Sequence, residues 1–437
     1  MEGRSVTRIS GLWRPEIIED IQVKTGLGRY RIRGFGTMRR VPSFEDLVFI
    51  PASLTRVPLE GYRERCETET VIGTRFAKEP LVLSAPVMIS GMSFGALSRN
   101  AKIALAKAAT LAGVSTTTGD GGMTDFEREH SARLIVQVLP SRYGLDPHHL
   151  VSAEAVEVVV GQGAKPGTGG LLLGQKVSPV VAEMRDLPEG VDQRSAVRHP
   201  DWIGPDDLVI KIEELRSVTD GRIPIIVKLG ATRVYEDVKL AVKAGADAVL
   251  VDGMEGGTAA APDPLMDHTG IPTLAAVTEA RRAIRDMGVE GEFQLIIAGG
   301  IRNGVDAAKA LALGADAVAI GTAALIALNC NRPIYTDDYR AIGAEPYACH
   351  HCHTGLCPVG IATQDPNLEA RLDPEEGAER VANFLYSMIQ EIQLFARACG
   401  KSNVHNLDRE DLRALTVEAA AMAKVPLAGT EWIPGAK

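Results

Sequence analysis

The sequence lacks three features that would place it in common functional classes: a basic excess, a secretory leader and a long apolar run. Its 437 residues include 47 Lys and Arg against 56 Asp and Glu, a net charge of −9, so binding to nucleic acid or to an anionic membrane has no electrostatic support. Residues 1–20 contain no apolar segment, so no signal peptide is predicted. The most apolar run, residues 310–330, is interrupted by Asp316 and two glycines and predicts a buried strand and helix, not a membrane span. We therefore expect a cytoplasmic protein.

Cysteine is also scarce. Six are present, and five of them lie between Cys330 and Cys399, which is unlike a secreted disulfide framework in a chain of this length. Cys349, Cys352 and Cys357 fall within nine residues and end in Cys-Pro. Such spacing is typical of an iron–sulfur loop, because thiolates are the soft ligands that these clusters use. On spacing alone, the interleaved histidines support a zinc site to the same degree, and free thiols are a third interpretation.

A repeating pattern extends from residue 85 to about residue 328. Short runs rich in β-forming residues end in glycine or a polar residue, and most are followed by an Ala/Leu/Lys helical pattern. Eight such units predict an α/β fold, a parallel (β/α)8 barrel of the TIM type, and favour closure over a doubly wound open sheet. The predicted strands are residues 86–90, 114–118, 134–138, 156–161, 224–229, 248–252, 294–298 and 317–321.

Two regions flank the predicted barrel, residues 85–328. Residues 1–84 show no long period and predict an N-terminal extension, a layer packed on the barrel. Residues 329–437 predict a C-terminal segment with the cysteine loop and further helices, which could close the barrel or meet partners. Within the barrel, residues 165–222 are long for one connection and predict an insertion at its top.

Glycine turns end the last two predicted strands, where barrel enzymes place their active sites. Such turns let backbone N–H groups approach a phosphate in front of a helix, although glycine also serves plain tight turns. Two of them on neighbouring strands favour phosphate binding. The candidate residues are Gly299, Gly300, Ile301, Gly321 and Thr322.

Other strand ends offer a bed for a flat ring and charges for an anion. The first strand ends in Ser90-Gly91-Met92-Ser93, and the sixth is followed by Gly256-Gly257-Thr258. Gln162 and Lys165 follow the fourth strand, and Lys228 lies on the fifth. A lysine partly closed to water can neutralise a reduced flavin or a substrate carboxylate. With the phosphate turns, these residues predict a flavin mononucleotide (FMN) site in which Lys165 and Lys228 are the catalytic residues.

Several stretches together resemble the flavin-binding synthase domain of glutamate synthases. The likeness covers residues 86–364, and within the family it is strongest to the flavoprotein subunits of the N-methylglutamate synthase type, where it extends to both ends of the chain. The matching stretches are residues 91–95 (GMSFG), 118–122 (TGDGG), 162–167 (QGAKPG), 256–258 (GGT) and 357–364 (CPVGIATQ).

The resemblance implies FMN at the barrel top, a [3Fe-4S] cluster held by three cysteines, and 2-oxoglutarate or its imine stacked on the flavin. Gln162, Lys165 and Arg185 stand at the family's oxoacid-binding positions. From the residues alone, a surface ion pair for Arg185 and a helix-capping role for Gln162 are the alternatives. Two substitutions concern the substrate, since Leu171 replaces a glutamine of the family and Asn100 a glutamate.

The cysteine spacing departs from the family's Cys-x5-Cys-x4-Cys. This chain has Cys349-x2-Cys352-x4-Cys357, and Cys330 stands where the family's first cysteine would be. Cys352 and Cys357 are therefore the predicted ligands, with Cys349 or Cys330 as the third. If both Cys349 and Cys330 bind, we expect a [4Fe-4S] cluster.

The resemblance predicts a synthase subunit that forms N-methylglutamate from glutamate and methylamine, by imine formation and hydride transfer from reduced flavin. The alternative is a glutamate synthase subunit that uses 2-oxoglutarate, glutamine-derived ammonia and an external electron donor. An electron-relay or scaffold subunit is an alternative of another class. No cysteine precedes Cys66, and no glycine-repeat β-helix follows the C-terminal helices. Amidotransferase-like and β-helix-like subunits are therefore expected as partners in a hetero-oligomer.

Overall fold

The structure, a computed structural model, describes residues 11–61 and 63–435. Residues 1–10, the first part of the segment predicted to lack a signal peptide, lie outside the described residues. Eight parallel strands form the central sheet, in the order β5-β15-β14-β12-β11-β8-β7-β6. The strands are β5 (Val87–Ile89), β6 (Thr116–Thr117), β7 (Leu134–Val138), β8 (Ala155–Val159), β11 (Ile225–Gly230), β12 (Ala248–Asp252), β14 (Gln294–Ala298) and β15 (Ala317–Ile320).

The two edge strands of this sheet meet, which makes it a barrel. Met88 of β5 bridges to Ser115, the residue before β6, and the Ile89 N–H donates to the Ser115 carbonyl at 2.9 Å. Every residue of the eight strands is buried, as expected for parallel strands covered on both faces. The predicted (β/α)8 fold is confirmed, and each predicted strand overlaps an observed one.

A hairpin closes the N-terminal end of the barrel. Strands β3 (Thr70–Ile72) and β4 (Leu81–Leu83) pair antiparallel. Their side chains Ile72, Leu81 and Leu83 join the same apolar cluster as the barrel interior. The C-terminal end of the barrel is therefore the end left for a site.

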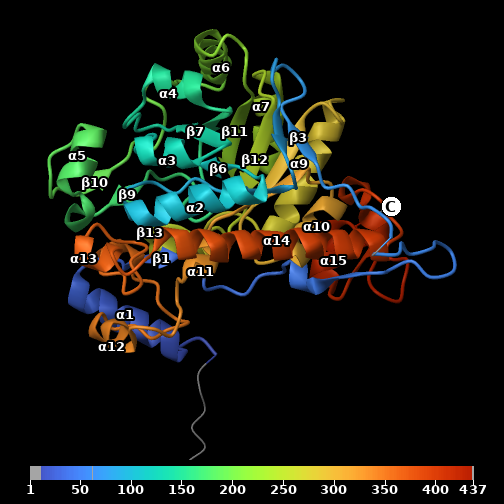
Figure 1. The fold of residues 1–437 in the computed structure, drawn as a ribbon. Coiled ribbons are helices and arrows are strands. Elements are labelled where there is room, and N and C mark those ends of the chain that lie inside the picture. The colour runs from blue at the N-terminus through green and yellow to red at the C-terminus, as the bar shows by residue number, and fades with distance from the viewer. Residues whose placement is uncertain (1–10, 62, 436–437) are drawn as a thin grey trace, which may run out of the picture.

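The long helix α14 (Pro374–Ala398) takes the place of the barrel's eighth outer helix. It packs against α2 (Arg99–Ala112), α10 (Gly304–Ala312) and the short α11 (Thr322–Leu328), and Figure 1 shows it lying along the barrel. Asp373 caps its first turn by accepting the N–H groups of Glu375 and Glu376. Its buried stripe recurs at helical spacing and includes Val381, Leu385, Met388 and Ile392.

The remaining helices surround the barrel or belong to the connections. Residues 160–206 form the insertion, with β9 (Leu171–Leu172), α5 (Pro179–Arg185) and β10 (Gln193–Arg194). The insertion is shorter than predicted because α6 (Asp207–Val218) is a barrel helix. The others are α1 (Pro15–Leu27), α3 (Asp125–His130), α4 (Pro147–Ser152), α7 (Val234–Lys243), α8 (Asp263–His268), α9 (Thr273–Asp286), α12 (Thr336–Ala341), α13 (Pro366–Glu369) and α15 (Val417–Ala423). In the described part of the chain, no helix has the length and apolar character needed to span a membrane.

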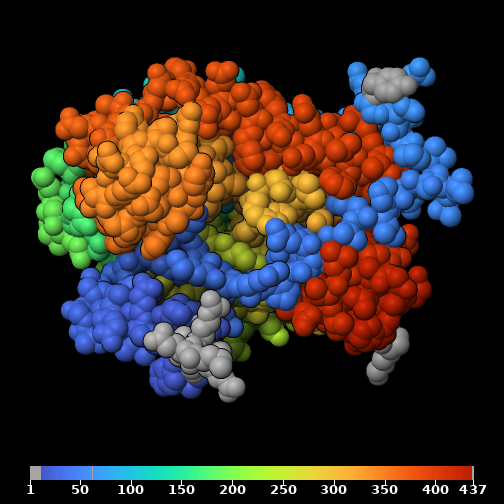
Figure 2. Space-filling model, turned by 90° about the horizontal axis from the view of Figure 1, so that it is seen from below, coloured from blue at the N-terminus to red at the C-terminus, as the bar shows by residue number. Residues whose placement is uncertain are grey.

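Segments from both ends of the chain lie over the C-terminal end of the barrel. Strand β1 (Ile32–Phe35) pairs antiparallel with β13 (Thr258–Pro262), and the Gly34 N–H donates to the carbonyl of His350 at 2.8 Å. Figure 2 shows this face, with the N-terminal residues in blue beside the cysteine-containing segment in orange. A second antiparallel pair also joins the two ends of the chain, β2 (Leu47–Phe49) with β16 (Leu412–Ala414).

Removing a buried side chain from α14 should destabilise the whole barrel. Leu385→Ala, at a fully buried position, is expected to lower the free energy of unfolding by about 2–5 kcal/mol, because it leaves a cavity. Urea unfolding followed by circular dichroism measures this. The matched control is Leu394→Ala on the same helix, where the side chain is 61% exposed. Equal effects of the two substitutions would show that α14 is not part of the barrel core.

Candidate active site

A cavity of ≈ 540 Å³ lies at the C-terminal ends of the barrel strands. Every strand, or the loop that follows it, contributes to its wall. The predicted site residues that line it are Ser90, Gly91, Met92, Ser93, Gln162, Lys165, Arg185, Lys228, Gly256, Gly257, Thr258, Gly299, Gly300, Ile301, Gly321, Thr322, Cys330, Cys352 and Cys357. Cys349 is absent from this wall. The structure brings the candidates together, while their individual roles stay predictions.

Free backbone donors collect where β14 and β15 end. Within the described residues, the N–H groups of Gly300, Ile301, Gly321 and Thr322 have no hydrogen-bond acceptor. Gly300 has φ +72°, and a Cβ there would lie 2.8 Å from Glu255 Cβ, so only glycine fits. A Cβ on Gly321, by contrast, would meet nothing closer than 4.0 Å. This end of the cavity can receive an anion.

The Arg302 side chain reaches the same end but is already engaged. Its Nε donates to Asp306 Oδ2 at 2.8 Å and its Nη2 to Asp306 Oδ1 at 3.0 Å, while Nη1 pairs with Glu45. The backbone donors are thus the groups left for an anion.

The small-residue bed after β5 is supported from below by polar side chains. A Cβ on Gly91 would lie 2.4 Å from Gln137 Nε2, so Gly91 rests directly on that amide. Gln137 Nε2 donates to Glu157 Oε1 at 2.6 Å. Lys102 Nζ donates to the Met92 carbonyl at 2.6 Å. The bed is therefore packed against Gln137 and anchored by Lys102.

Gln137 and Glu157 were missed by the sequence reasoning. They lie on β7 and β8, whose other residues are apolar and buried. A polar residue inside such a strand costs free energy unless it has a partner, so it was an available signal for a site. Glu157 Oε1 also lies 3.9 Å from Lys228 Nζ.

Lys228 faces a second acid across the cavity floor. Asp252 at the end of β12 accepts the Gly163 N–H at 2.8 Å. Burial raises the pKa of Asp252, and the charge of Lys228 opposes that change. The floor thus holds one lysine between two buried carboxyl groups.

Lys165 is buried in the wall, with 7% of its surface exposed. The loop after β8 carries it, six residues beyond Val159. Its Nζ has one distant partner, the carbonyl of Ala260 at 3.4 Å. Burial lowers its pKa to about 8, although the charge of Asp120 acts in the opposite direction. Such a lysine is an unsatisfied cation facing the cavity.

Arg185, at the end of α5, is buried to 3% exposure. Its Nη1 donates to Gln193 Oε1 and its Nη2 to the Phe94 carbonyl, both at 2.6 Å, while Nε has no partner. The surface ion pair considered from the sequence is therefore wrong. The helix cap considered for Gln162 is also wrong, since no described helix begins beside it.

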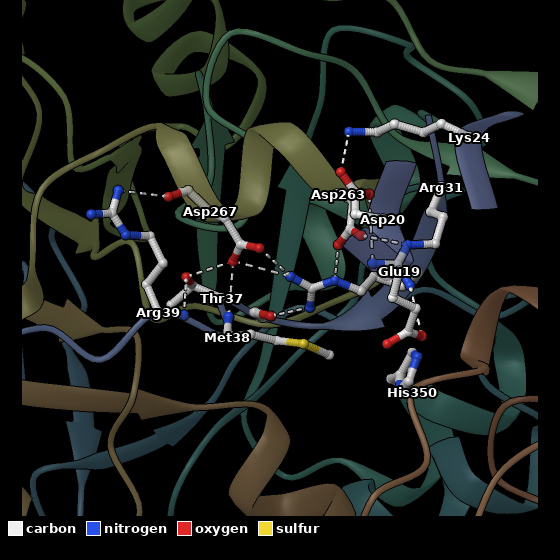
Figure 3. Close-up of polar contacts among 12 residues, drawn as sticks. Glu19, Asp20, Lys24, Arg31, Thr37, Met38, Arg39, Asp263, Asp267 and His350 are labelled. Atoms are coloured by element: carbon white, nitrogen blue, oxygen red, sulfur yellow. Dashed lines mark hydrogen bonds and ion pairs between the residues drawn. The ribbon is translucent and has the colours of Figure 1, made fainter. Parts of the chain in front are cut away.

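An N-terminal segment covers the mouth of the cavity, which the sequence did not predict. Phe35, Gly36 and Thr37 line the wall. They are held by Arg33, whose Nε pairs with Asp263 and whose Nη2 lies 3.1 Å from Asp267 Oδ1. Figure 3 shows Thr37, Asp263 and Asp267 of this network. The Thr37 hydroxyl donates to Asp267 Oδ1 at 2.9 Å.

Three cysteines open onto the same cavity. Cys330, Cys352 and Cys357 line it, and none of the chain's six cysteines is in a disulfide. Burial raises the pKa of the Cys330 thiol, and the charges of the neighbouring cysteines, Cys349 included, add to that change. Across residues 11–61 and 63–435, no group of three or more His, Cys, Asp or Glu side chains is arranged to hold a metal ion.

A buried lysine connects these cysteines to the insertion. Lys176 Nζ donates to the carbonyls of Ala96 at 2.7 Å and Cys352 at 3.0 Å. Burial lowers its pKa to about 8, and the charges of Cys352 and Cys357 oppose that change. A positive charge beside thiolates favours their ionised form.

The conserved region in glutamate synthase matches residues 43–402 of this chain. The chain belongs to the glutamate synthase family. It is 59% identical over 418 residues to a glutamate synthase large subunit-like protein of Rhizobium meliloti (strain 1021), covering 96% of this chain and 95% of that one. It is 37% identical to an archaeal-type glutamate synthase [NADPH] of Thermotoga neapolitana, covering 92% and 81%. It is also 32% identical to the glutamate synthase [NADPH] large chain of Bacillus subtilis (strain 168), where the match covers 71% of this chain and 20% of that one.

Solved structures share the fold of this glutamate synthase family member. A lactate oxidase of Pediococcus acidilactici superposes with a TM-score of 0.54 at 16% identity, covering 85% of this chain and 84% of that one. A mandelate oxidase variant with (S)-mandelic acid superposes with a TM-score of 0.52 at 19% identity, covering 85% of this chain and 86% of that one. At these identities the likeness shows the fold alone.

The burial of Lys165 should appear in the pH dependence of stability of the flavin-free protein. Its pKa is about 8 in the folded chain against an ordinary 10.5. At a pH between these two values, Lys165 is neutral in the folded chain and charged in the unfolded chain, so unfolding takes up a proton. Raising the pH through this range therefore stabilises the folded wild type. Lys165→Met does not show this increase in stability with pH, because methionine does not titrate. The urea midpoint of Lys165→Met should exceed that of wild type at about pH 7, and the difference should shrink as the pH rises towards 10.5. A difference that is independent of pH would contradict the account.

Proposed function

We propose that this glutamate synthase family chain is an FMN-dependent synthase subunit that couples an amine to a 2-oxo dicarboxylate. The observation that carries the proposal is the cavity itself. It combines backbone N–H groups that are free to bind a phosphate with a bed for a flat ring. It also holds two buried cations, Lys165 and Arg185, that have no acidic partner within 4 Å among the described residues.

The residues present fit FMN. The N–H groups of Gly300, Ile301, Gly321 and Thr322 would hold its phosphate. The bed from Ser90 to Ser93 would carry the ring, with Lys228 as the nearby cation. When bound, FMN supplies two-electron, hydride-transferring chemistry.

Arg185, Gln162 and Lys165 would hold the substrate. The free Nε of Arg185 and the ammonium of Lys165 suit the two carboxylates of a dicarboxylic acid such as 2-oxoglutarate. With a pKa of about 8, Lys165 can also hold or release a proton near physiological pH. The segment from Phe35 to Thr37 would exclude water from the reacting atoms.

Methylamine is the proposed amine, and N-methylglutamate the product. Leu171, at a position where the family resemblance places a glutamine, lines the cavity, and an apolar wall suits an N-methyl group better than ammonia. The names of the relatives, glutamate synthases [NADPH], support glutamate as the product instead. Asn100 does not line the cavity; its amide donates to the Leu372 carbonyl at 2.9 Å.

We further propose an iron–sulfur cluster, [3Fe-4S] with three cysteines or [4Fe-4S] with four. Cys330, Cys352 and Cys357 are the proposed ligands because they line one cavity, and Cys349 is the candidate fourth. The fit rests on the donor chemistry, four unpaired and partly buried thiols in one region. Amidotransferase-like and β-helix-like subunits remain the proposed partners, in a cytoplasmic hetero-oligomer.

The reaction is tested with the purified complex under anaerobic conditions. Glutamate and methylamine without added reductant should yield N-methylglutamate, because glutamate itself would reduce the flavin. Glutamate formed only from 2-oxoglutarate, an ammonia source and a reductant would establish the ammonia version. If the complex turns over neither set of substrates and electrons still pass between its subunits, the chain is an electron-relay subunit.

The choice of third ligand is tested by iron content. Cys330→Ser is expected to lower the iron bound per chain, because the cluster loses a thiolate. Cys349→Ser is the matched control and should keep iron with a three-cysteine cluster. Iron and acid-labile sulfide analysis measures both. If Cys349→Ser loses iron and Cys330→Ser keeps it, the assignment is reversed.

A further inference from the structure

Asp120 is a charged group of the cavity wall that the proposed function leaves unused. It lies in the loop after β6, within the sequence Thr118-Gly119-Asp120-Gly121-Gly122. A Cβ on Gly119 would lie 2.3 Å from the Ser93 backbone nitrogen, and one on Gly121 would lie 2.6 Å from Arg185 Nε. The tight loop thus places Asp120 between the ring bed and the substrate arginine.

The Asp120 carboxylate is held in place by hydroxyl groups and has no cationic partner of its own. Ser141 Oγ donates to Oδ1 at 2.6 Å, and Ser195 Oγ donates to Oδ2. No ion pair within 4 Å joins Asp120 to Lys165, Arg185 or any other described residue. Each carboxylate oxygen keeps a lone pair for a ligand. The charge of Asp120 nevertheless acts on Lys165 and on Arg185.

The three charges form a pattern of two cations and one anion around a shared space. A 2-oxo dicarboxylate needs the two cations only, and a nearby carboxylate weakens its binding. An amino dicarboxylate, with two carboxylates and one ammonium, matches all three. We infer that Asp120 is the site for the amino group of glutamate or its N-methyl derivative, so that the cavity is built to bind the amino acid as well as the oxoacid.

This inference rests on the proposed function and assigns Asp120 a binding role in it. The amino group would donate to Asp120 while Lys165 and Arg185 hold the carboxylates. The amino acid would thereby be fixed at both ends beside the ring bed. Asp120 also adds selectivity, because removing it should favour the oxoacid over the amino acid.

The test compares the binding of L-glutamate and 2-oxoglutarate to the flavin-loaded protein by titration calorimetry. The flavin is kept reduced under nitrogen, so that glutamate cannot be oxidised. Asp120→Asn should weaken glutamate binding roughly 10- to 100-fold, the loss of one charge-assisted hydrogen bond. It should leave 2-oxoglutarate binding unchanged or tighter. The matched control is Asp220→Asn, an exposed carboxylate that pairs with Lys78.

The outcomes separate this inference from the function it rests on. Equal weakening of both ligands, or loss of flavin from Asp120→Asn, would make Asp120 a structural support and overturn the inference alone. Wild-type binding of 2-oxoglutarate without glutamate would overturn it as well. Binding of neither ligand to wild type would overturn the proposed function itself.

Discussion

The central constraint on the cavity is the burial of positive charge at the C-terminal end of a barrel. Taking an ammonium or guanidinium group out of water costs several kcal/mol unless a counter-charge compensates. Lys165 and Arg185 have only carbonyl and amide partners in the chain. A folded protein keeps such groups when a bound anion supplies the missing charge. The geometry of the cavity therefore supports the proposal that an anionic ligand pairs with Lys165 and Arg185.

The surrounding elements keep that charge dry and in place. The hairpin β3–β4 packs its apolar side chains into the opposite end of the barrel. The N-terminal segment closes this mouth, fixed by Arg33 between Asp263 and Asp267. Lys176 ties the insertion that carries Arg185 to the cysteine segment. Parts of the chain that are hundreds of residues apart thus meet over a single cavity.

Much of the fold could be predicted because barrel strands have a strong local signal. Most strands are short, mainly apolar runs buried on both faces, followed by glycine or a polar residue. The strand-end rule then located Lys228, Gly300 and Gly321 without any contact information. The spacing of the cysteines drew attention to their segment, and the structure places Cys330, Cys352 and Cys357 at the cavity wall; their role as ligands stays a prediction.

The missed features depend on contacts between distant segments. Phe35 to Thr37 enter the site through pairing of β1 with β13, and nothing in their local sequence indicates this. The role of α14 as the eighth barrel helix likewise depends on packing against α2 and α10. Asp120 belongs to a glycine-rich stretch of the family resemblance, but its place in the same cavity wall as Lys165 and Arg185 follows from the fold and from no spacing rule.

The most direct test of the central claim is the flavin content of wild type and of Gly321→Val. A side chain at Gly321 would point into open space, with Ser90 Cβ the nearest atom at 4.0 Å, so the substitution should leave folding intact and fill the phosphate end of the cavity. Absorbance and FMN release should give one FMN per chain for wild type and none for Gly321→Val, with equal thermal stability of the flavin-free forms. Stoichiometric FMN in Gly321→Val would contradict the account.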